Sequence, residues 1–202
     1  MVQVIAGHAA DRELDPRALH GMYRLRNSVF HERLGWDVTS RGGLERDEYD
    51  EFDPVYLIAR EPSRHVSGCM RLLPTTGSYM LRDTFPELLR GEEEPCDEKV
   101  WDVSRFAVAS AGDATPGHAG SSEITLELVR AAVDYAFEHG IEAYVAVVSL
   151  GLERIFRRIG LPVRRFGDGK SARIGDVRAV ACRIEMNEEA RRSVRRTVRR
   201  AA

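Results

Sequence analysis

A carboxylate, a hydroxyl and a guanidinium fall close together within the stretch 100–108, as Asp102, Ser104 and Arg105. The stretch alternates well enough to form a strand, in which Asp102 and Ser104 would share one face with Phe106. Charge in a central strand is costly to bury unless it is paired. We therefore expect Asp102 and Arg105 to meet partners on neighbouring elements, as in a structural ion pair, or a β-bulge to turn one of them toward a cavity.

A second candidate is Arg26, which lies three residues after Tyr23 and four before Phe30. The apolar spacing predicts a helix from about Pro16 to Phe30, with Asp15 as its cap, and puts Arg26 beside the apolar face. An arginine in that position needs a partner.

Carboxylates are plentiful in the acidic run 45–53, which contains Asp47 and Asp50. The whole segment 31–53 lacks periodicity and predicts a loop, and loops of this length are usually functional or mobile.

The remaining elements predict an α/β protein with a mixed sheet. Alternation and apolar runs predict strands at 2–5, 55–59, 66–73, 100–108, 143–149, 163–166 and 177–186. Helical spacing predicts a short excursion at 80–89, a long helix from Ser121 or Ser122 to Gly140, and a shorter one at 152–158. This order predicts a three-layer α/β sandwich, with helices on both faces of the sheet.

Composition limits the protein's class. A chain of 202 residues, with 43% hydrophobic and 31% charged residues, is typical of one globular domain, here 1–202. Its net charge of -2 excludes a globally basic nucleic-acid binder. Three cysteines without a CxxC pair favour reduced thiols, buried at Cys69 and Cys182. Because no secretory signal or membrane-spanning apolar run is found, we expect a cytoplasmic protein.

The C-terminal stretch 188–202 carries three arginine pairs, which on a helix would share one face. Such charge runs are most often a solvated terminal helix. The alternative is a docking surface for an acidic partner.

Several familiar motifs are missing from the chain. It has no phosphate loop, no HExxH, no GxSxG and no histidine–cysteine cluster spaced for a metal. No GxGxxG follows a strand, so a dinucleotide in a Rossmann crevice is not expected. We expect neither a metal nor a cofactor.

The ordered set of candidate residues resembles a known family. Its parts are Arg26-x-x-x-Phe30-x-x-x-x-Gly35-Trp36, Asp47-x-x-Asp50 before Val55-Tyr56, Gly68-Cys-Met-Arg71-Leu-Leu-Pro-Thr-Thr76, Phe85, and Trp101-Asp102-Val103-Ser104-Arg105-Phe106. Together they resemble the LuxI-type autoinducer synthases, which make acyl-homoserine lactones. The resemblance implies a fold related to the acyl-CoA N-acyltransferases. It implies S-adenosylmethionine as a substrate, with acyl carrier protein or coenzyme A as the acyl donor.

The resemblance also implies roles for these residues. Arg26 and Arg105 suit the substrate carboxylate, since a guanidinium fork matches it. Asp47 and Asp50 would hold the amine or organise the arginines, and Phe30 and Trp36 would cover the sulfonium and adenine. Catalytic roles are implied for Asp102, Arg105 and Arg26, with Asp102 as the base where most family members have Glu. Supporting roles are implied for Arg71, Phe85 and Ser104. Each residue also has a structural alternative, as a core aromatic, a loop charge or part of an ion-pair network.

The acyl chain is expected between the 121–139 helix and the 143–149 strand, in a pocket formed by Phe106, Leu126, Ala146 and Ser149. Apolar residues before Ser149 favour an unsubstituted chain. The loop 109–120 lacks the phosphate-binding turn of ordinary N-acyltransferases, which favours a carrier-protein donor. An ordinary N-acyltransferase and a non-catalytic sensor remain the alternatives.

Overall fold

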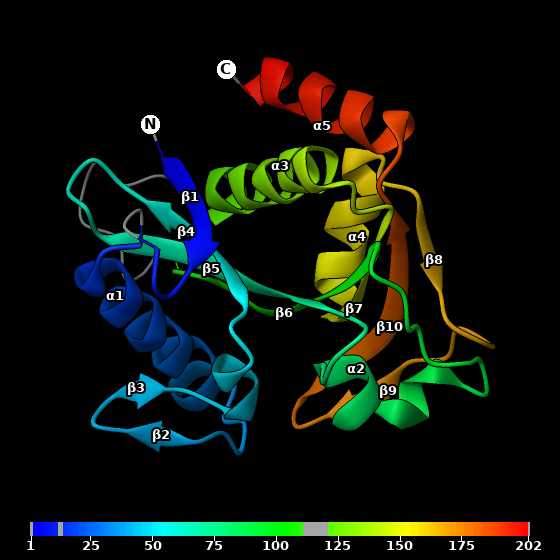
Figure 1. Cartoon of the computed structure of the whole chain (residues 1–202), viewed down its shortest axis with the longest axis horizontal. Helices are drawn as coiled ribbons and strands as arrows, with labels where there is room; N and C mark the ends of the chain where they lie inside the picture. The colour runs from blue at the N-terminus through cyan, green and yellow to red at the C-terminus, as the bar shows by residue number, and fades with distance from the viewer. Residues whose placement is uncertain (1, 12–13, 111–120, 202) are drawn as a thin grey trace. The chain divides into compact units, whose positions relative to one another are not determined.

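The computed structural model describes residues 2–11, 14–110 and 121–201, which divide into two compact units (Figure 1). Unit 1 comprises Met1–Arg71 and Arg105–Ala132, and unit 2 comprises Leu72–Ser104 and Val133–Ala202. We describe each unit by itself. The expectation of one domain over 1–202 stays a prediction.

Unit 1 is built on the strand order β1-β4-β5-β6. The strands are β1 (Gln3–His8), β4 (Val55–Arg60), β5 (Val66–Pro74) and the later residues of β6 (Val100–Val108). β1 pairs antiparallel with β4, from Gln3 opposite Arg60 to His8 opposite Val55. Residues of β4 from Tyr56 to Ala59 are fully buried, as a strand covered on both faces must be.

Helices cover both faces of β5. α1 (Pro16–Arg26) crosses it so closely that a Cβ at Gly21 would lie 2.8 Å from Val66. On the other face α3 (Ser121–His139) comes as near, because a Cβ at Gly68 would lie 2.6 Å from Ile124. Unit 1 therefore has the predicted three layers.

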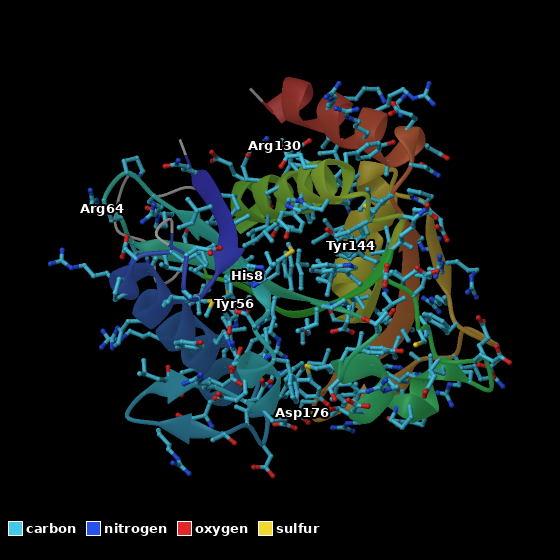
Figure 2. All side chains as sticks on the ribbon, in the orientation of Figure 1. His8, Tyr56, Arg64, Arg130, Tyr144 and Asp176 are labelled. Carbon is cyan, nitrogen blue, oxygen red and sulfur yellow. The ribbon has the colours of Figure 1, made fainter. Side chains whose placement is uncertain are left out.

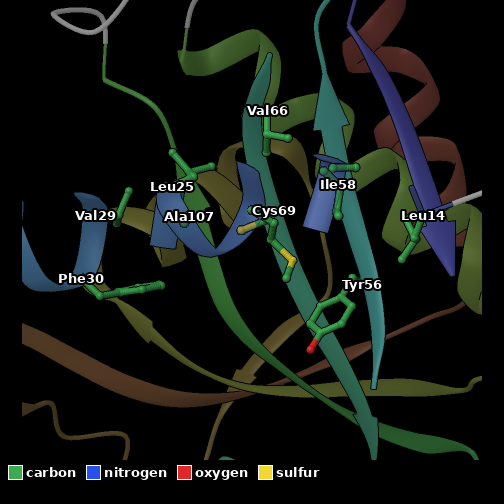
Figure 3. Close-up of a cluster of buried hydrophobic side chains, with 11 residues drawn as sticks. Leu14, Leu25, Val29, Phe30, Tyr56, Ile58, Val66, Cys69 and Ala107 are labelled. Carbon is green, nitrogen blue, oxygen red and sulfur yellow. The ribbon is translucent and has the colours of Figure 1, made fainter. Parts of the chain in front are cut away.

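The core of unit 1 lies under α1 (Figure 3). Its buried members are Leu14, Ala18, Met22, Leu25, Val29, Phe30, Tyr56, Ile58, Val66, Cys69 and Ala107, and Trp36 packs against it. The predicted cap is confirmed, because the Asp15 carboxylate accepts hydrogen bonds from the N–H groups of Arg17 and Ala18 at 2.9 Å.

The prediction of a loop over 31–53 is wrong. α1 continues into a π-helix, η1 (Asn27–Arg33), and a hairpin of β2 (Ser40–Arg41) and β3 (Leu44–Glu45) follows. A 3-10 helix, η2 (Glu48–Glu51), ends the segment. The hairpin forms because Gly42 and Gly43 supply positive φ angles of 60° and 77° at its turn.

Unit 2 contains the mixed part of the sheet, with the order β6-β7-β10-β8 and β9 paired to β10. The early residues of β6 run parallel to β7 (Ala143–Ser149), with Val100 opposite Ala143. β10 (Val177–Glu185) is antiparallel to β7, to β8 (Val163–Arg165) and to β9 (Ala172–Ile174). The sequence did not predict β9, a three-residue strand with no buried residue.

Four short or terminal helical elements complete unit 2. They are α2 (Met80–Asp83), η3 (Pro86–Leu89), α4 (Leu150–Ile159) and α5 (Glu188–Ala201). Tyr144 on β7 is 2% exposed and Tyr56 on β4 is fully buried, which marks the interior of each unit (Figure 2). The expected mixed sheet with flanking helices is confirmed.

All three cysteines are free thiols, buried at Cys69 and Cys182 and exposed at Cys96. Burial raises the pKa of the Cys69 thiol to about 12. Among the described residues, no helix is both long and apolar enough to cross a bilayer. In the same residues, no cluster of three or more His, Cys, Asp or Glu is placed to hold a metal ion.

Candidate active site

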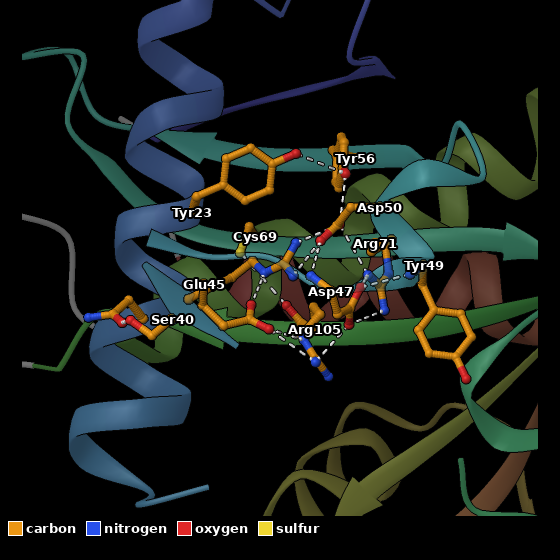
Figure 4. Close-up of polar contacts among 12 residues, drawn as sticks. Tyr23, Ser40, Glu45, Asp47, Tyr49, Asp50, Tyr56, Cys69, Arg71 and Arg105 are labelled. Atoms are coloured by element: carbon orange, nitrogen blue, oxygen red, sulfur yellow. Dashed lines mark hydrogen bonds and ion pairs between the residues drawn. The ribbon is translucent and has the colours of Figure 1, made fainter. Parts of the chain in front are cut away.

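Three arginines and three carboxylates form one buried network in unit 1 (Figure 4). They are Arg26 on α1, Arg71 on β5, Arg105 on β6, Glu45 on β3, Asp47 before η2 and Asp50 within it. None of the six side chains is more than 8% exposed. The formal charges balance, which is the condition under which a buried ionic cluster is tolerated.

Arg26 anchors the network. Its Nη1 and Nη2 donate to the two oxygens of Asp50 at 2.8 Å, and its Nε donates to Glu45 at 2.5 Å. Burial alone would lower the pKa of Arg26, but the Asp50 and Glu45 carboxylates outweigh it and raise that pKa. The side chain is 0% exposed, so its guanidinium is enclosed within the network.

Asp47 and Asp50 are set by the local fold of η2. The Asp47 carboxylate accepts from the N–H of Tyr49 at 3.1 Å, and the Asp47 N–H donates to Asp50 at 2.9 Å. Arg71 donates to both carboxylates, at 3.0 Å to Asp50. Burial alone would raise the pKa of Asp50, but Arg26 and Arg71 hold it below its usual value.

Arg105 adopts a left-handed backbone conformation, with φ of 52°. This conformation is uncommon outside glycine and breaks the strand alternation. Asp102 and Ala107 are therefore both buried, and the predicted shared face of Asp102 and Phe106 is wrong. The guanidinium donates to Asp47 at 2.7 Å and to Glu45 at 3.0 Å. The expectation that Arg105 meets partners on neighbouring elements is thus confirmed.

A stacked pair of aromatic rings reaches Arg105 through Phe30. The Phe30 and Trp36 rings stack with centroids 5.3 Å apart and planes 21° from parallel. The Arg105 guanidinium carbon lies 5.3 Å from the Phe30 ring centroid. Phe30 is 4% exposed and belongs to the core, while Trp36 is half-buried. Seven predicted site residues therefore meet in unit 1, namely Arg26, Phe30, Trp36, Asp47, Asp50, Arg71 and Arg105.

Sequence reasoning missed Glu45 and Tyr56. Glu45 is the third carboxylate of the network, and Tyr56 donates to Asp50 at 2.8 Å. Tyr56 also meets the Tyr23 hydroxyl at 3.3 Å. Charge arithmetic gave the signal for Glu45, because three buried arginines need one carboxylate more than Asp47 and Asp50 supply.

Asp102, Ser104 and Phe85 belong to unit 2. Asp102 is 1% exposed, and its carboxylate accepts the N–H of Leu81 on α2 at 3.4 Å. Ser104 and Phe85 are half-buried, and Phe85 directly precedes η3. Asp102 thus meets a partner on a neighbouring element, as its position in a central strand requires.

The predicted acyl-pocket residues are divided between the units. Phe106 and Leu126 belong to unit 1, where Leu126 is 9% exposed on α3. Ala146 on β7 is 1% exposed in unit 2. Ser149 ends β7, and its hydroxyl accepts the N–H of Leu152 at 3.1 Å, so it caps α4. The predicted donor loop 109–120 lies largely outside the described residues.

The chain matches the family model for autoinducer synthases over residues 11–194. It is 45% identical to an acyl-homoserine-lactone synthase of Pseudomonas aeruginosa over 177 residues, which is 87% of this chain and 86% of that relative.

Solved structures agree with this match. The acyl-homoserine-lactone synthase LasI has a TM-score of 0.86 and 42% identity, covering 96% of this chain and 94% of that one. BjaI, a CoA-dependent synthase solved with S-adenosylmethionine and isopentyl-CoA, has a TM-score of 0.83 and 27% identity, over 98% and 90% of the two chains. An N-acetyltransferase from Lactobacillus plantarum shares the fold alone, with a TM-score of 0.57 and 17% identity over 92% and 99%. The chain belongs to the autoinducer synthase family.

Proposed function

We propose that this acyl-homoserine-lactone synthase binds S-adenosylmethionine against its arginine–carboxylate network. The enzyme acylates the α-amine of S-adenosylmethionine from an acyl thioester. The neutral amine attacks the thioester carbonyl and displaces the thiol. The methionine carboxylate then displaces the sulfonium at the γ-carbon, which closes the lactone and releases methylthioadenosine. S-adenosylmethionine is a substrate, and the proposal includes no cofactor.

One observation carries the assignment of roles at the network. The Arg105 and Asp47 side chains are each 8% exposed, while those of Arg26, Asp50 and Glu45 are 0% exposed. Arg105 is therefore assigned to the substrate carboxylate, and Asp47 to its ammonium group. Two opposite charges added to a balanced cluster leave it balanced.

The other network residues position these two. Arg26 and Arg71 donate hydrogen bonds to Asp50 and hold it in place. Glu45 accepts a hydrogen bond from Arg105 and so orients that guanidinium. Phe30 lies beside Arg105 and Trp36 stacks on Phe30. Both rings are assigned to the sulfonium and adenine, where cation–π attraction contributes about 0.5–2 kcal/mol. Phe85 and Ser104 are assigned a supporting role.

Asp102 is assigned as the base that takes the proton of the amine, directly or through one water. A carboxylate one methylene shorter than glutamate favours the water-mediated route. Asp102→Asn should abolish acyl transfer and leave S-adenosylmethionine affinity within about twofold, since the variant keeps the side-chain volume. Asp102→Glu should keep activity. Equal activity of Asp102→Asn and the parent enzyme would remove Asp102 from the base role.

We propose that Phe106 and Leu126 of unit 1 contact the acyl chain and that this chain is unsubstituted. The donor is proposed to be an acyl carrier protein that docks on α5. Ala190, Ser193 and Val194 of this helix are buried, whereas Arg192, Arg195 and Arg196 are exposed. Acidic partners are attracted by such a surface.

The decisive experiment is mass spectrometry of the enzyme with S-adenosylmethionine and a panel of acyl-carrier-protein and acyl-CoA donors. An acyl-homoserine lactone and methylthioadenosine should appear together, and the lactone mass gives the chain. An acylated amine without methylthioadenosine would instead indicate an ordinary N-acyltransferase. Tight S-adenosylmethionine binding without turnover on any donor would indicate a sensor.

The docking assignment has its own test. Changing Arg192, Arg195 and Arg196 together to glutamine should raise the Michaelis constant for the acyl-carrier-protein donor, because these side chains lie on the exposed face of α5. The Michaelis constant for S-adenosylmethionine should not change. Equal carrier-protein constants in variant and parent would place docking elsewhere.

A further inference from the structure

The core of unit 1 contains a tyrosine whose hydroxyl is not needed for packing. Tyr56 on β4 is fully buried among the apolar side chains under α1, where a phenylalanine ring would fill the same space. A hydroxyl in such a core costs free energy unless it has a hydrogen-bond partner. Tyr56 donates to the Asp50 carboxylate at 2.8 Å, so its polar end belongs to the buried network (Figure 4).

The Tyr56 hydroxyl is one of three donors to a single oxygen of Asp50. Besides this hydroxyl, Oδ1 of Asp50 accepts from Arg26 at 2.8 Å and from Arg71 at 3.0 Å. The three donors come from β4, α1 and β5. The carboxylate therefore cannot turn without losing a hydrogen bond to one of three elements, and Tyr56 supplies the neutral donor among them.

A second hydroxyl extends this chain of hydrogen bonds. The hydroxyl oxygens of Tyr23 on α1 and Tyr56 lie 3.3 Å apart. Tyr56 gives its single hydroxyl proton to Asp50, so between the two tyrosines Tyr23 must be the donor and Tyr56 the acceptor. The distance is long for a bond between two hydroxyls, so we expect Tyr23 to contribute less than Tyr56.

Contacts of the Tyr23 ring hold this second hydroxyl in place. The guanidinium carbon of Arg26 lies 5.3 Å from the Tyr23 ring centroid, and that of Arg46 lies 5.8 Å from it. The Tyr23 and Tyr56 rings meet edge to face, with centroids 6.3 Å apart. Arg26 thus contacts both the Asp50 carboxylate and the Tyr23 ring, so the chain of hydroxyls is tied to the network at each end.

We infer that Tyr56 is a positioning residue for S-adenosylmethionine binding and that Tyr23 supports it. Asp50 accepts the N–H of Asp47 at 2.9 Å, and Arg71 donates to both carboxylates. A turn of Asp50 would therefore displace Asp47, the residue assigned above to the substrate ammonium, and the inference rests on that proposed function. Neither tyrosine is assigned to a reacting atom, so both act on substrate affinity and not on the chemical step.

Calorimetric titration of the full chain with S-adenosylmethionine tests this role. Tyr56→Phe should weaken binding by about tenfold, the value of one hydrogen bond to a charged group. The kcat of lactone synthesis at saturating S-adenosylmethionine should stay within about twofold of the parent value. Tyr79→Phe is the matched control, because Tyr79 is also fully buried and its hydroxyl donates to the Pro95 carbonyl at 2.6 Å in unit 2. Both variants lose one buried hydrogen bond, but Tyr79→Phe should keep the parent affinity.

Tyr23→Phe tests the same chain at a half-buried residue. It should weaken binding by about threefold in the parent, and by nothing further in the Tyr56→Phe variant, where the chain is already broken. Parent affinity in Tyr56→Phe would overturn the inference alone, as would equal losses in Tyr56→Phe and Tyr79→Phe or additive losses in the Tyr23 and Tyr56 variants. Absence of S-adenosylmethionine binding to the parent would contradict the proposed function and this inference with it.

Discussion

The molecule contains two clusters of arginine around buried carboxylate, one in each unit. In unit 1 the network buries both its cations and its anions, since the Arg26, Asp50 and Glu45 side chains are 0% exposed. In the unit 2 cluster the buried member is Glu153 on α4, at 2% exposure. Its partners Arg165 on β8 and Arg157 are 35% and 50% exposed. The same residue types thus form an enclosed network and a surface clamp.

The two clusters differ in how far water reaches and screens their charges. Arg165 donates to both Glu153 oxygens, at 2.8 and 2.6 Å, and this clamp joins α4 to β8. Solvent reaches both arginines, so losing one partner leaves a charge that water can still stabilise. In the enclosed network water does not reach the charge that remains, so losing one partner lowers the free energy of unfolding by more than it does in the clamp. An enclosed cluster therefore holds its charged groups rigidly, while the clamp fixes only a helix against a strand.

The largest expected effect is that of Arg26→Ala. This change leaves Glu45 and Asp50 buried without their shared cation, and we expect the free energy of unfolding to fall by about 3–5 kcal/mol. Urea denaturation followed by circular dichroism measures it. Arg157→Ala is the matched control in the clamp and should cost less than about 1 kcal/mol. Similar losses in the two variants would refute the contrast between the clusters.

Asp50→Asn should cost about 2–3 kcal/mol at neutral pH, because charge-assisted hydrogen bonds from Arg26, Arg71 and Tyr56 are weakened. The pKa of Asp50 is lowered in the folded state. Its stabilising contribution is therefore present above the unfolded pKa of about 4 and is lost as the pH falls toward the folded value. Urea titrations from pH 7 to pH 3 should show the free energy of unfolding of the parent approaching that of the variant. A constant difference over that range would contradict a lowered pKa.

Much of the enclosed network could be predicted because each of its arginines lies in a strong pattern. Arg26 follows a helical stripe and Arg105 sits in an alternating strand, so each arginine needed a partner. Strand β6 was predicted with its observed bounds. The choice among the acidic residues 45–53 was harder. Asp47 and Asp50 were identified by resemblance, whereas Glu45 depends on a hairpin of two-residue strands.

The remaining errors come from local backbone geometry. The left-handed φ at Arg105 shifts the burial pattern of β6, and no residue-type signal marks a non-glycine in that conformation. Helical periodicity predicted one helix through Phe30, because a π-helical continuation keeps a similar apolar spacing. The sequence analysis did not predict that the Ser149 hydroxyl caps α4, although serine before a helix is a common cap.

Glu153→Gln tests the clamp directly. Charge-assisted hydrogen bonds from Arg165 hold the pKa of Glu153 below its usual value, and those from Arg157 add to them. The neutral amide should lower the free energy of unfolding by about 1–2 kcal/mol, less than Asp50→Asn, since both arginines remain hydrated. Calorimetric affinity for S-adenosylmethionine should stay unchanged. A large loss of that affinity would show that the clamp contributes to the binding site.

Arg105→Lys should have the smallest effect on stability and still impair function. The Arg105 side chain is 8% exposed, and a lysine there keeps the positive charge but loses part of the forked contact, so we expect the free energy of unfolding to fall by about 1 kcal/mol, the net value of one hydrogen bond. The planar fork that reaches Glu45 and Asp47 together is lost, however, and a point charge cannot reproduce it. Calorimetry should show S-adenosylmethionine affinity reduced about tenfold or more, the value of one charge-assisted hydrogen bond. Unchanged affinity in a stable variant would move the carboxylate contact from Arg105 to another residue and leave the network with a purely structural role.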